Sequence, residues 1–80
     1  MDKKIALLAI IITDIEQVEQ VNNLLHSFRD YIIGRMGIPY GERKVNVISI
    51  ALDAPQEVIN SLSGKLGMLQ GVSSKVLVTK

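Results

Sequence analysis

The longest apolar run in the chain, Ile5 to Ile12, constrains the fold more than any other feature of the sequence. It contains only Ala, Leu and Ile, and polar residues bound it on both sides, with Thr13 and Asp14 following directly. A helix that spans a membrane needs about 20 such residues, so this run is too short to cross a bilayer. A short, Ile-rich run of this kind is typical of a buried central strand.

A second run, Val45 to Leu52, is also predicted to form a strand because β-branched residues dominate it. Successive side chains of a strand point to opposite faces of the sheet, and a sheet covered on one side usually alternates apolar and polar residues. Here only Asn46 and Ser49 interrupt the second run, and no polar residue interrupts Ile5 to Ile12. Both faces of the predicted sheet are therefore apolar.

The composition limits the classes of protein that the chain can represent. With 80 residues it forms a single domain, predicted here over 1–80, and 48% hydrophobic residues exclude an intrinsically disordered chain. Nine lysines and arginines face eight aspartates and glutamates, so the net charge of +1 shows no electrostatic footprint for nucleic acid. The sequence has no cysteine, which excludes disulfides and thiolate-ligated metals.

Two segments show helical periodicity and start signals. The first helix is predicted from Thr13-Asp14, which fit a capping box, to Ser27 or Phe28. The second is predicted to begin with Asp53 as its cap and Pro55 in its first turn, and to end at Gly67 in the left-handed conformation. Their apolar faces comprise Val18, Val21, Leu24, Leu25 and Phe28 in the first helix, and Val58, Ile59, Leu62 and Leu66 in the second.

Strands are also predicted at Tyr31–Ile33 and Val72–Val78, which makes the order β-α-β-β-α-β. This order is typical of the α+β ferredoxin-like (split βαβ) architecture, a sandwich with a four-stranded antiparallel sheet and two helices on one face. The other face of the sheet then remains bare. An apolar patch of that extent is larger than monomers usually expose, so we expect a homo-oligomer, either a dimer or a tetramer. The predicted interface residues are Leu8, Ile10, Ile48, Ile50, Ser63 and Gly64.

The segment from Gly34 to Lys44 is predicted to be a loop because it concentrates glycine, proline and charged residues. Glycines allow the backbone to approach a ligand, and arginines can hold a carboxylate or phosphate through two hydrogen bonds. A hairpin loop without a ligand remains an equal alternative. The candidate ligand-binding residues are Arg35, Gly37, Tyr40, Gly41 and Arg43.

No catalytic, metal or cofactor site is predicted from the residues. His26 is the only histidine and falls on the polar side of the first helix, and Gly64-Lys65 lacks the partner residues of a phosphate-binding loop. Lys3 and Lys4 precede an apolar run as in a secretory signal, but no cleavage site of small residues follows it. We therefore expect a cytoplasmic protein that does not enter a membrane.

Three segments together resemble the family of iron-only hydrogenase system regulators. They are Val21–His26, Ile33–Tyr40 and the Leu-Ser-Gly-Lys-Leu-Gly segment Leu62–Gly67, with Gly71-Val72 following. The resemblance implies a small ACT-like, ferredoxin-fold domain with a regulatory role in the expression or maturation of a hydrogenase, that is, a candidate transcriptional regulator. The family is similar to the ligand-binding half of nickel-responsive repressors, which use several histidines and a cysteine.

These observations favour a stand-alone domain that regulates by binding a small molecule or a protein partner. With His26 alone, nickel sensing does not carry over, and the absence of glycine from Thr13–Glu16 departs from ACT domains that bind amino acids. The alternative is an enzyme of the acylphosphatase type, which needs an arginine in that same loop, where this chain has none. Direct binding of nucleic acid is disfavoured, since no aromatic residue lies in the two central strands.

Overall fold

The apolar run near the start of the chain forms β1, a central strand of a four-stranded antiparallel sheet in the order β2-β3-β1-β4. A computed structural model describes residues 2–79, and its topology is the ferredoxin-like arrangement expected from the sequence. The elements are β1 (Lys3–Ile12), the short 3-10 turn η1 (Ile15–Gln17), α1 (Val18–Ser27), η2 (Arg29–Tyr31), β2 (Ile32–Tyr40), β3 (Val45–Pro55), α2 (Gln56–Gly67) and β4 (Val72–Val78).

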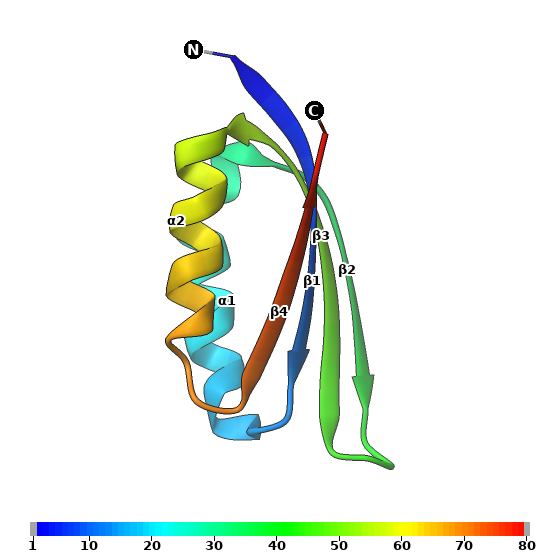
Figure 1. Ribbon diagram of the computed structural model, residues 1–80. Coiled ribbons are helices and arrows are strands. Elements are labelled where there is room, and N and C mark those ends of the chain that lie inside the picture. Colours follow the sequence, from blue (N-terminus) through cyan, green and yellow to red (C-terminus); the bar gives the residue numbers. More distant parts are fainter. Residues whose placement is uncertain (1, 80) are drawn as a thin grey trace.

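Both helices cover one face of the sheet and leave the other face uncovered (Figure 1). α1 buries Val21 and Leu25 against the sheet, and α2 buries Ile59, Leu62 and Leu66. The start of β1 and the end of β4 lie at one end of the sheet, and the turn between β2 and β3 projects at the opposite end (Figure 1). Within residues 2–79, no helix is long and apolar enough to cross a membrane.

The core lies between the helices and alternate residues of the two central strands. β1 and β3 pair so that Leu8 faces Ile50 and Ile10 faces Ile48, and all four side chains are buried. Buried and exposed residues alternate along β1, and the buried ones are those that face the helices. The prediction that Leu8, Ile10, Ile48 and Ile50 form an interface between copies is therefore wrong, because the helices of the same chain already cover them.

The segment predicted as a loop from Gly34 to Lys44 is mostly a strand. β2 continues to Tyr40, and only residues 41–44 form the turn to β3. β2 lies at an edge of the sheet and pairs with β3 alone. An edge strand tolerates proline because one of its sides needs no hydrogen-bonded partner, and Pro39 lies opposite Asn46 in this register. A shift in register between Ile32 and Gly34 marks a bulge at the start of the strand.

The two helix starts differ in how well the sequence predicts them. Asp14 accepts a hydrogen bond from the Glu16 backbone N–H at 3.0 Å and so caps η1, from which α1 continues. The predicted cap Asp53 is wrong, since β3 extends to Pro55 and this proline occupies the N-cap position of α2 without a side-chain bond. The apolar alternation of β3 thus continues through Ala54, two residues beyond the predicted strand end at Leu52.

The left-handed glycine lies four residues later than predicted. Gly67 is the last residue of α2, whereas Gly71, with φ of +74°, turns the chain into β4. The Gly71 carbonyl accepts hydrogen bonds from the Thr13 backbone N–H at 2.8 Å and from the Thr13 hydroxyl at 3.1 Å. A Cβ atom at Gly71 would lie 2.5 Å from the Cβ of Asp14, so only glycine fits this contact.

Candidate interaction surface

The uncovered side of the sheet, called the open face below, presents a continuous apolar surface built from all four strands. The register of the sheet brings its members together, since Val47 lies between Ile11 and Ile38, and Leu7 lies beside Leu77. Their exposed fractions range from 38% for Val47 to 72% for Leu77. The large apolar side chains of the open face are Ile5, Leu7, Ile11, Met36, Ile38, Tyr40, Val47 and Leu77.

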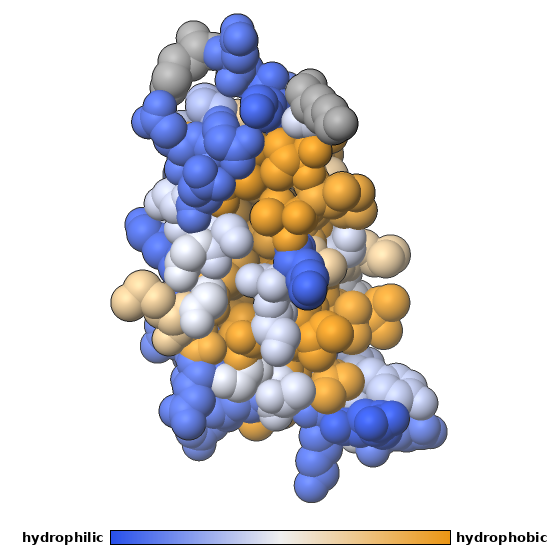
Figure 2. All heavy atoms as spheres, in the orientation of Figure 1, coloured by the Kyte–Doolittle hydropathy of each residue, from blue (hydrophilic) through white to orange (hydrophobic). Residues whose placement is uncertain are grey.

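Small residues occupy the middle of this surface. Ala9 lies opposite Ser49, and Leu7 lies opposite Ala51, which in turn is next to Gly34. The open face therefore has a shallow centre with larger side chains around it. Figure 2 shows hydrophobic side chains gathered along the sheet, with hydrophilic side chains over much of the helix layer and at both ends of the molecule.

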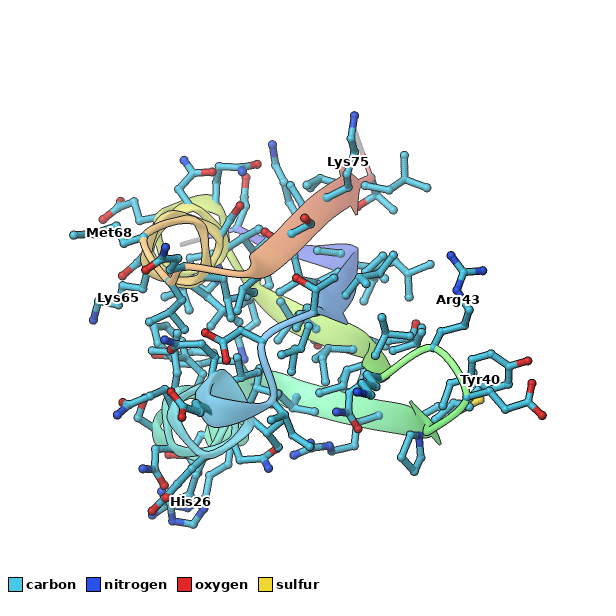
Figure 3. The ribbon with its side chains drawn as sticks, turned by 90° about the horizontal axis from the view of Figure 1, so that it is seen from below. His26, Tyr40, Arg43, Lys65, Met68 and Lys75 are labelled. Atoms are coloured by element: carbon cyan, nitrogen blue, oxygen red, sulfur yellow. The ribbon has the colours of Figure 1, made fainter. Side chains whose placement is uncertain are left out.

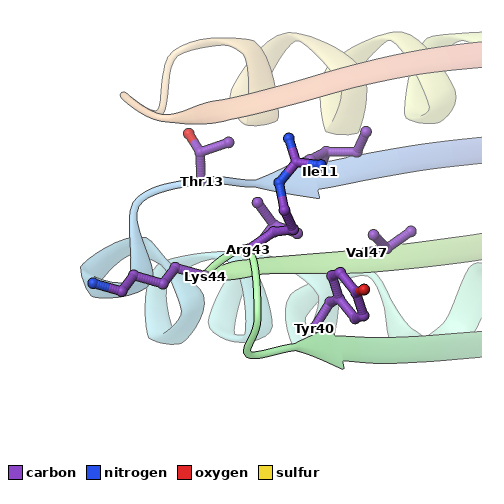
Figure 4. A pocket seen from close by; sticks show the side chains of 7 residues that line it. Ile11, Thr13, Tyr40, Arg43, Lys44 and Val47 are labelled. Carbon is purple, nitrogen blue, oxygen red and sulfur yellow. The ribbon is translucent and has the colours of Figure 1, made fainter.

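Two hollows lie on the open face around Ile11. The larger, with a volume of about 500 Å³, is lined by Ile11, Val47, Tyr40 and Arg43, among others. Figure 4 shows the Arg43 side chain rising from the β2–β3 turn toward Ile11, with Tyr40 and Val47 on neighbouring strands. The smaller, of about 150 Å³, is lined by Ile11, Ala9 and Lys75 together with two serines of β4.

Two positive charges near this part of the open face, Arg43 and Lys75, have no partner among the residues that the structure describes. Among residues 2–79, neither the guanidinium of Arg43 nor the ammonium of Lys75 makes a hydrogen bond or an ion pair. Seen along the sheet, Arg43, Tyr40 and Lys75 all lie on the side away from the helices (Figure 3). Glu42, beside Arg43 in the turn, accepts a hydrogen bond from the Tyr40 hydroxyl at 2.8 Å.

The predicted ligand-binding residues separate into two groups. Tyr40 and Arg43 meet at the larger hollow, and Gly41 lines a neighbouring hollow with Thr13 and Lys44. Arg35 belongs to the helix-facing side of β2, where its guanidinium donates to the Asn22 side-chain oxygen at 3.1 Å. Gly37, two residues further along the strand, shares the side of Arg35. Whether any of these residues binds a ligand stays a prediction.

The remaining predicted interface residues, Ser63 and Gly64, lie on α2, in the layer opposite the open face. Gly64 is exposed, and a Cβ atom there would have no neighbour within 4 Å. His26 is exposed as expected, and no group of three metal-ligating His, Cys, Asp or Glu side chains occurs within the described part of the chain.

Of the large apolar residues on the open face, only Tyr40 was among the predicted site residues, and Ile11, Val47 and Lys75 are among the members of the surface that the sequence prediction missed. The sequence did contain a signal for Val47, because Ser49 and Asp53 share its face of β3. Polar residues on that face mark it as the side without helices.

The chain matches the family model of the TM1266-like iron-only hydrogenase system regulators over residues 4–76. It belongs to this family. Among solved structures, the uncharacterized protein TM1266 from Thermotoga maritima is 35% identical and superposes with a TM-score of 0.94, with 99% of this chain and 100% of that chain covered. The family resemblance predicted from the three sequence segments is therefore confirmed.

A second solved structure, a formyltetrahydrofolate deformylase from Pseudomonas putida, superposes with a TM-score of 0.65 at 11% identity. The match covers 91% of this chain but 28% of the deformylase chain. At this identity the likeness shows the ferredoxin-like fold alone. No protein of curated function matches the chain.

Proposed function

We propose that this member of the regulator family is a stand-alone regulatory domain that works as a homo-oligomer, with the open face buried between copies. Its regulatory target is an iron-only hydrogenase system, which the family name suggests. The domain acts by binding a small molecule or a protein partner and has no catalytic activity of its own. The extent of the exposed apolar surface is the observation that carries this proposal.

The total surface of the chain supports burial of the open face. A compact monomer of 8.8 kDa is expected to expose about 4,800 Å², whereas this chain exposes 5483 Å². The excess of about 700 Å² is close to the ~800 Å² that each partner buries in an interface of standard size. The open face of one chain therefore offers enough surface for a second copy to cover.

The shape of the open face favours a second copy of the same chain over an unrelated partner. In an interface with two-fold symmetry, each patch contacts an identical patch. Large side chains such as Leu7 and Ile11 on one copy then meet the shallow centre at Ala9 and Ser49 on the other. Alternation of large and small residues across two facing layers permits close packing.

The proposal is tested by measuring the mass of the protein in solution with size-exclusion chromatography and light scattering. The wild type is expected to be a dimer or tetramer at micromolar concentration. Ile11→Lys places a charge in the open face at a side chain that is 45% exposed, so the fold is retained while the oligomer dissociates. The matched control is Met68→Lys, at a side chain that is 85% exposed beside the helix layer, which should leave the oligomer intact.

A monomeric wild type at these concentrations would overturn the oligomer. The link to the hydrogenase is tested separately, by introducing Ile11→Lys and Met68→Lys into the host and measuring hydrogenase transcript and activity. We expect Ile11→Lys to reproduce the effect of deleting the gene and Met68→Lys to behave as the wild type. Unchanged hydrogenase levels after deletion would exclude a regulatory role in that system.

A further inference from the structure

We propose that the open face binds a small organic anion around Ile11, with its carboxylate or phosphate held by Arg43 and Lys75 and its apolar part lying on Ile11 and Val47. This inference rests on the proposed function, since the anion is enclosed when a second copy covers the face. It identifies the chemical class of ligand that the regulator takes.

The two hollows on the open face provide the position for such a ligand. Ile11 lines both of them, which places the hollow of about 500 Å³ beside Arg43 next to the hollow of about 150 Å³ beside Lys75. The floor between the two cations is apolar, with Val47 next to Ile11 across the sheet. A ligand that matches this surface has an apolar body and an anionic group.

Arg43 and Lys44 line the larger hollow and Lys75 lines the smaller, whereas no acidic residue in the described part of the chain lines either of them. Within residues 2–79, the side chains of Arg43 and Lys75 make no ion pair or hydrogen bond. Asp53 belongs to the same face but lies opposite Ile5, near the other end of β1. Glu42 follows Tyr40 in the turn but lines neither hollow, and its carboxylate accepts a hydrogen bond from the Tyr40 hydroxyl.

Burial of the open face makes these unpaired cations unfavourable unless an anion accompanies them. Removing a charge from water carries a large desolvation penalty that only a well-placed partner offsets. In a symmetric contact, the second copy contributes the same cations, and its acidic residues Glu42 and Asp53 lie outside its two hollows as well. Arg43 offers the planar pair of donors that matches a carboxylate or phosphate, and Lys75 adds a second donor from β4. An enclosed organic anion therefore stabilises the oligomer.

The experiment compares four probes that separate charge from apolar contact. Hexanoate and hexyl phosphate carry both features with different anionic groups, inorganic phosphate carries the charge alone, and hexanol carries the apolar chain alone. Isothermal titration calorimetry measures binding to the wild-type protein, and native mass spectrometry records the oligomer with and without each probe. We expect hexanoate or hexyl phosphate to bind at least tenfold more tightly than inorganic phosphate and hexanol.

Charge-neutralising variants locate the site. Arg43→Gln and Lys75→Gln are each expected to weaken the preferred probe at least tenfold. Their matched controls, Arg29→Gln and Lys65→Gln, lie outside the open face and should retain wild-type affinity. Equal binding of hexanoate and hexanol, or equal affinity in Arg43→Gln and the wild type, would overturn the proposed anion site.

The two proposals fail in distinguishable ways. An oligomer that forms fully and binds none of the probes overturns the anion site and leaves the oligomeric regulator standing. A chain that stays monomeric with every probe overturns both. Stabilisation of the oligomer by the preferred probe, lost in Arg43→Gln and kept in Arg29→Gln, supports both.

Discussion

At the scale of single residues, Gly71 is the position where a substitution has the clearest expected effect. Its φ of +74° is strained for any residue with a side chain, and a Cβ atom would lie 2.5 Å from the Cβ of Asp14. We expect Gly71→Ala to lower the free energy of unfolding by roughly 2 kcal/mol or more, because backbone strain and a steric clash add together. Urea denaturation followed by circular dichroism measures this change.

The control for this prediction is another glycine of the same chain. Gly64 lies on the exposed side of α2, and the Cβ of an alanine there would meet no neighbouring side chain within 4 Å. Gly64→Ala is expected to raise the free energy of unfolding by up to ~1 kcal/mol through helix propensity. Equal effects of the two substitutions would show that the contact between Gly71 and Asp14 does not constrain the fold.

At the scale of elements, the two faces of β1 differ in burial, so alanine substitutions of its adjacent leucines should differ in their effect on stability. Leu8 is 1% exposed beneath the helices, so Leu8→Ala should cost about 2–5 kcal/mol of stability. Leu7 is 48% exposed on the open face, so Leu7→Ala should cost less than about half as much stability as Leu8→Ala. It should also weaken the oligomer. Denaturation at low protein concentration, combined with light scattering, separates these effects. A greater loss of stability for Leu7→Ala would contradict the assignment of faces.

A second prediction at this scale concerns β2. Gly37 lies in the middle of this edge strand, and its Cβ position is free of neighbours within 4 Å. Gly37→Thr should raise the free energy of unfolding by about 0.5–1 kcal/mol, because threonine favours extended backbone more than glycine does. Thermal unfolding measures the change. A flexible ligand loop over residues 34–44 would instead show no gain in stability.

The elements also show what the sequence alone could predict. The order of strands and helices followed from local periodicity, and β4 was predicted at its observed bounds, Val72–Val78. The length of β2 was missed because glycine and proline indicate a turn locally, whereas an edge position tolerates both. Only the tertiary arrangement places β2 at an edge.

The candidate site was harder to predict than the fold for a related reason. Both faces of β1 are apolar, so local alternation does not say which one the helices cover. Leu8 and Ile10 were assigned to the interface although they form the core, while their neighbour Ile11 lies on the open face. Tyr40 and Arg43, two of the predicted ligand-binding residues, line the same hollow because they lie at the end of β2 and in the short turn that follows. Lys75 comes from a distant strand, so sequence proximity gave no indication of it.

At the scale of the whole molecule, the proposed oligomer predicts that stability depends on protein concentration. The helix layer and the sheet enclose a single small core, and the open face contributes to stability only when another copy covers it. For a dimer that unfolds to separate chains, raising the protein from 1 to 100 μM should increase the apparent stability by about 2.7 kcal/mol per mole of dimer.

Thermal unfolding across this range of concentration should therefore show a rising midpoint for the wild type and Met68→Lys. Ile11→Lys should unfold at a constant midpoint, because a monomer gains nothing from mass action. A constant midpoint for the wild type would mean that the apolar open face faces water in the working protein.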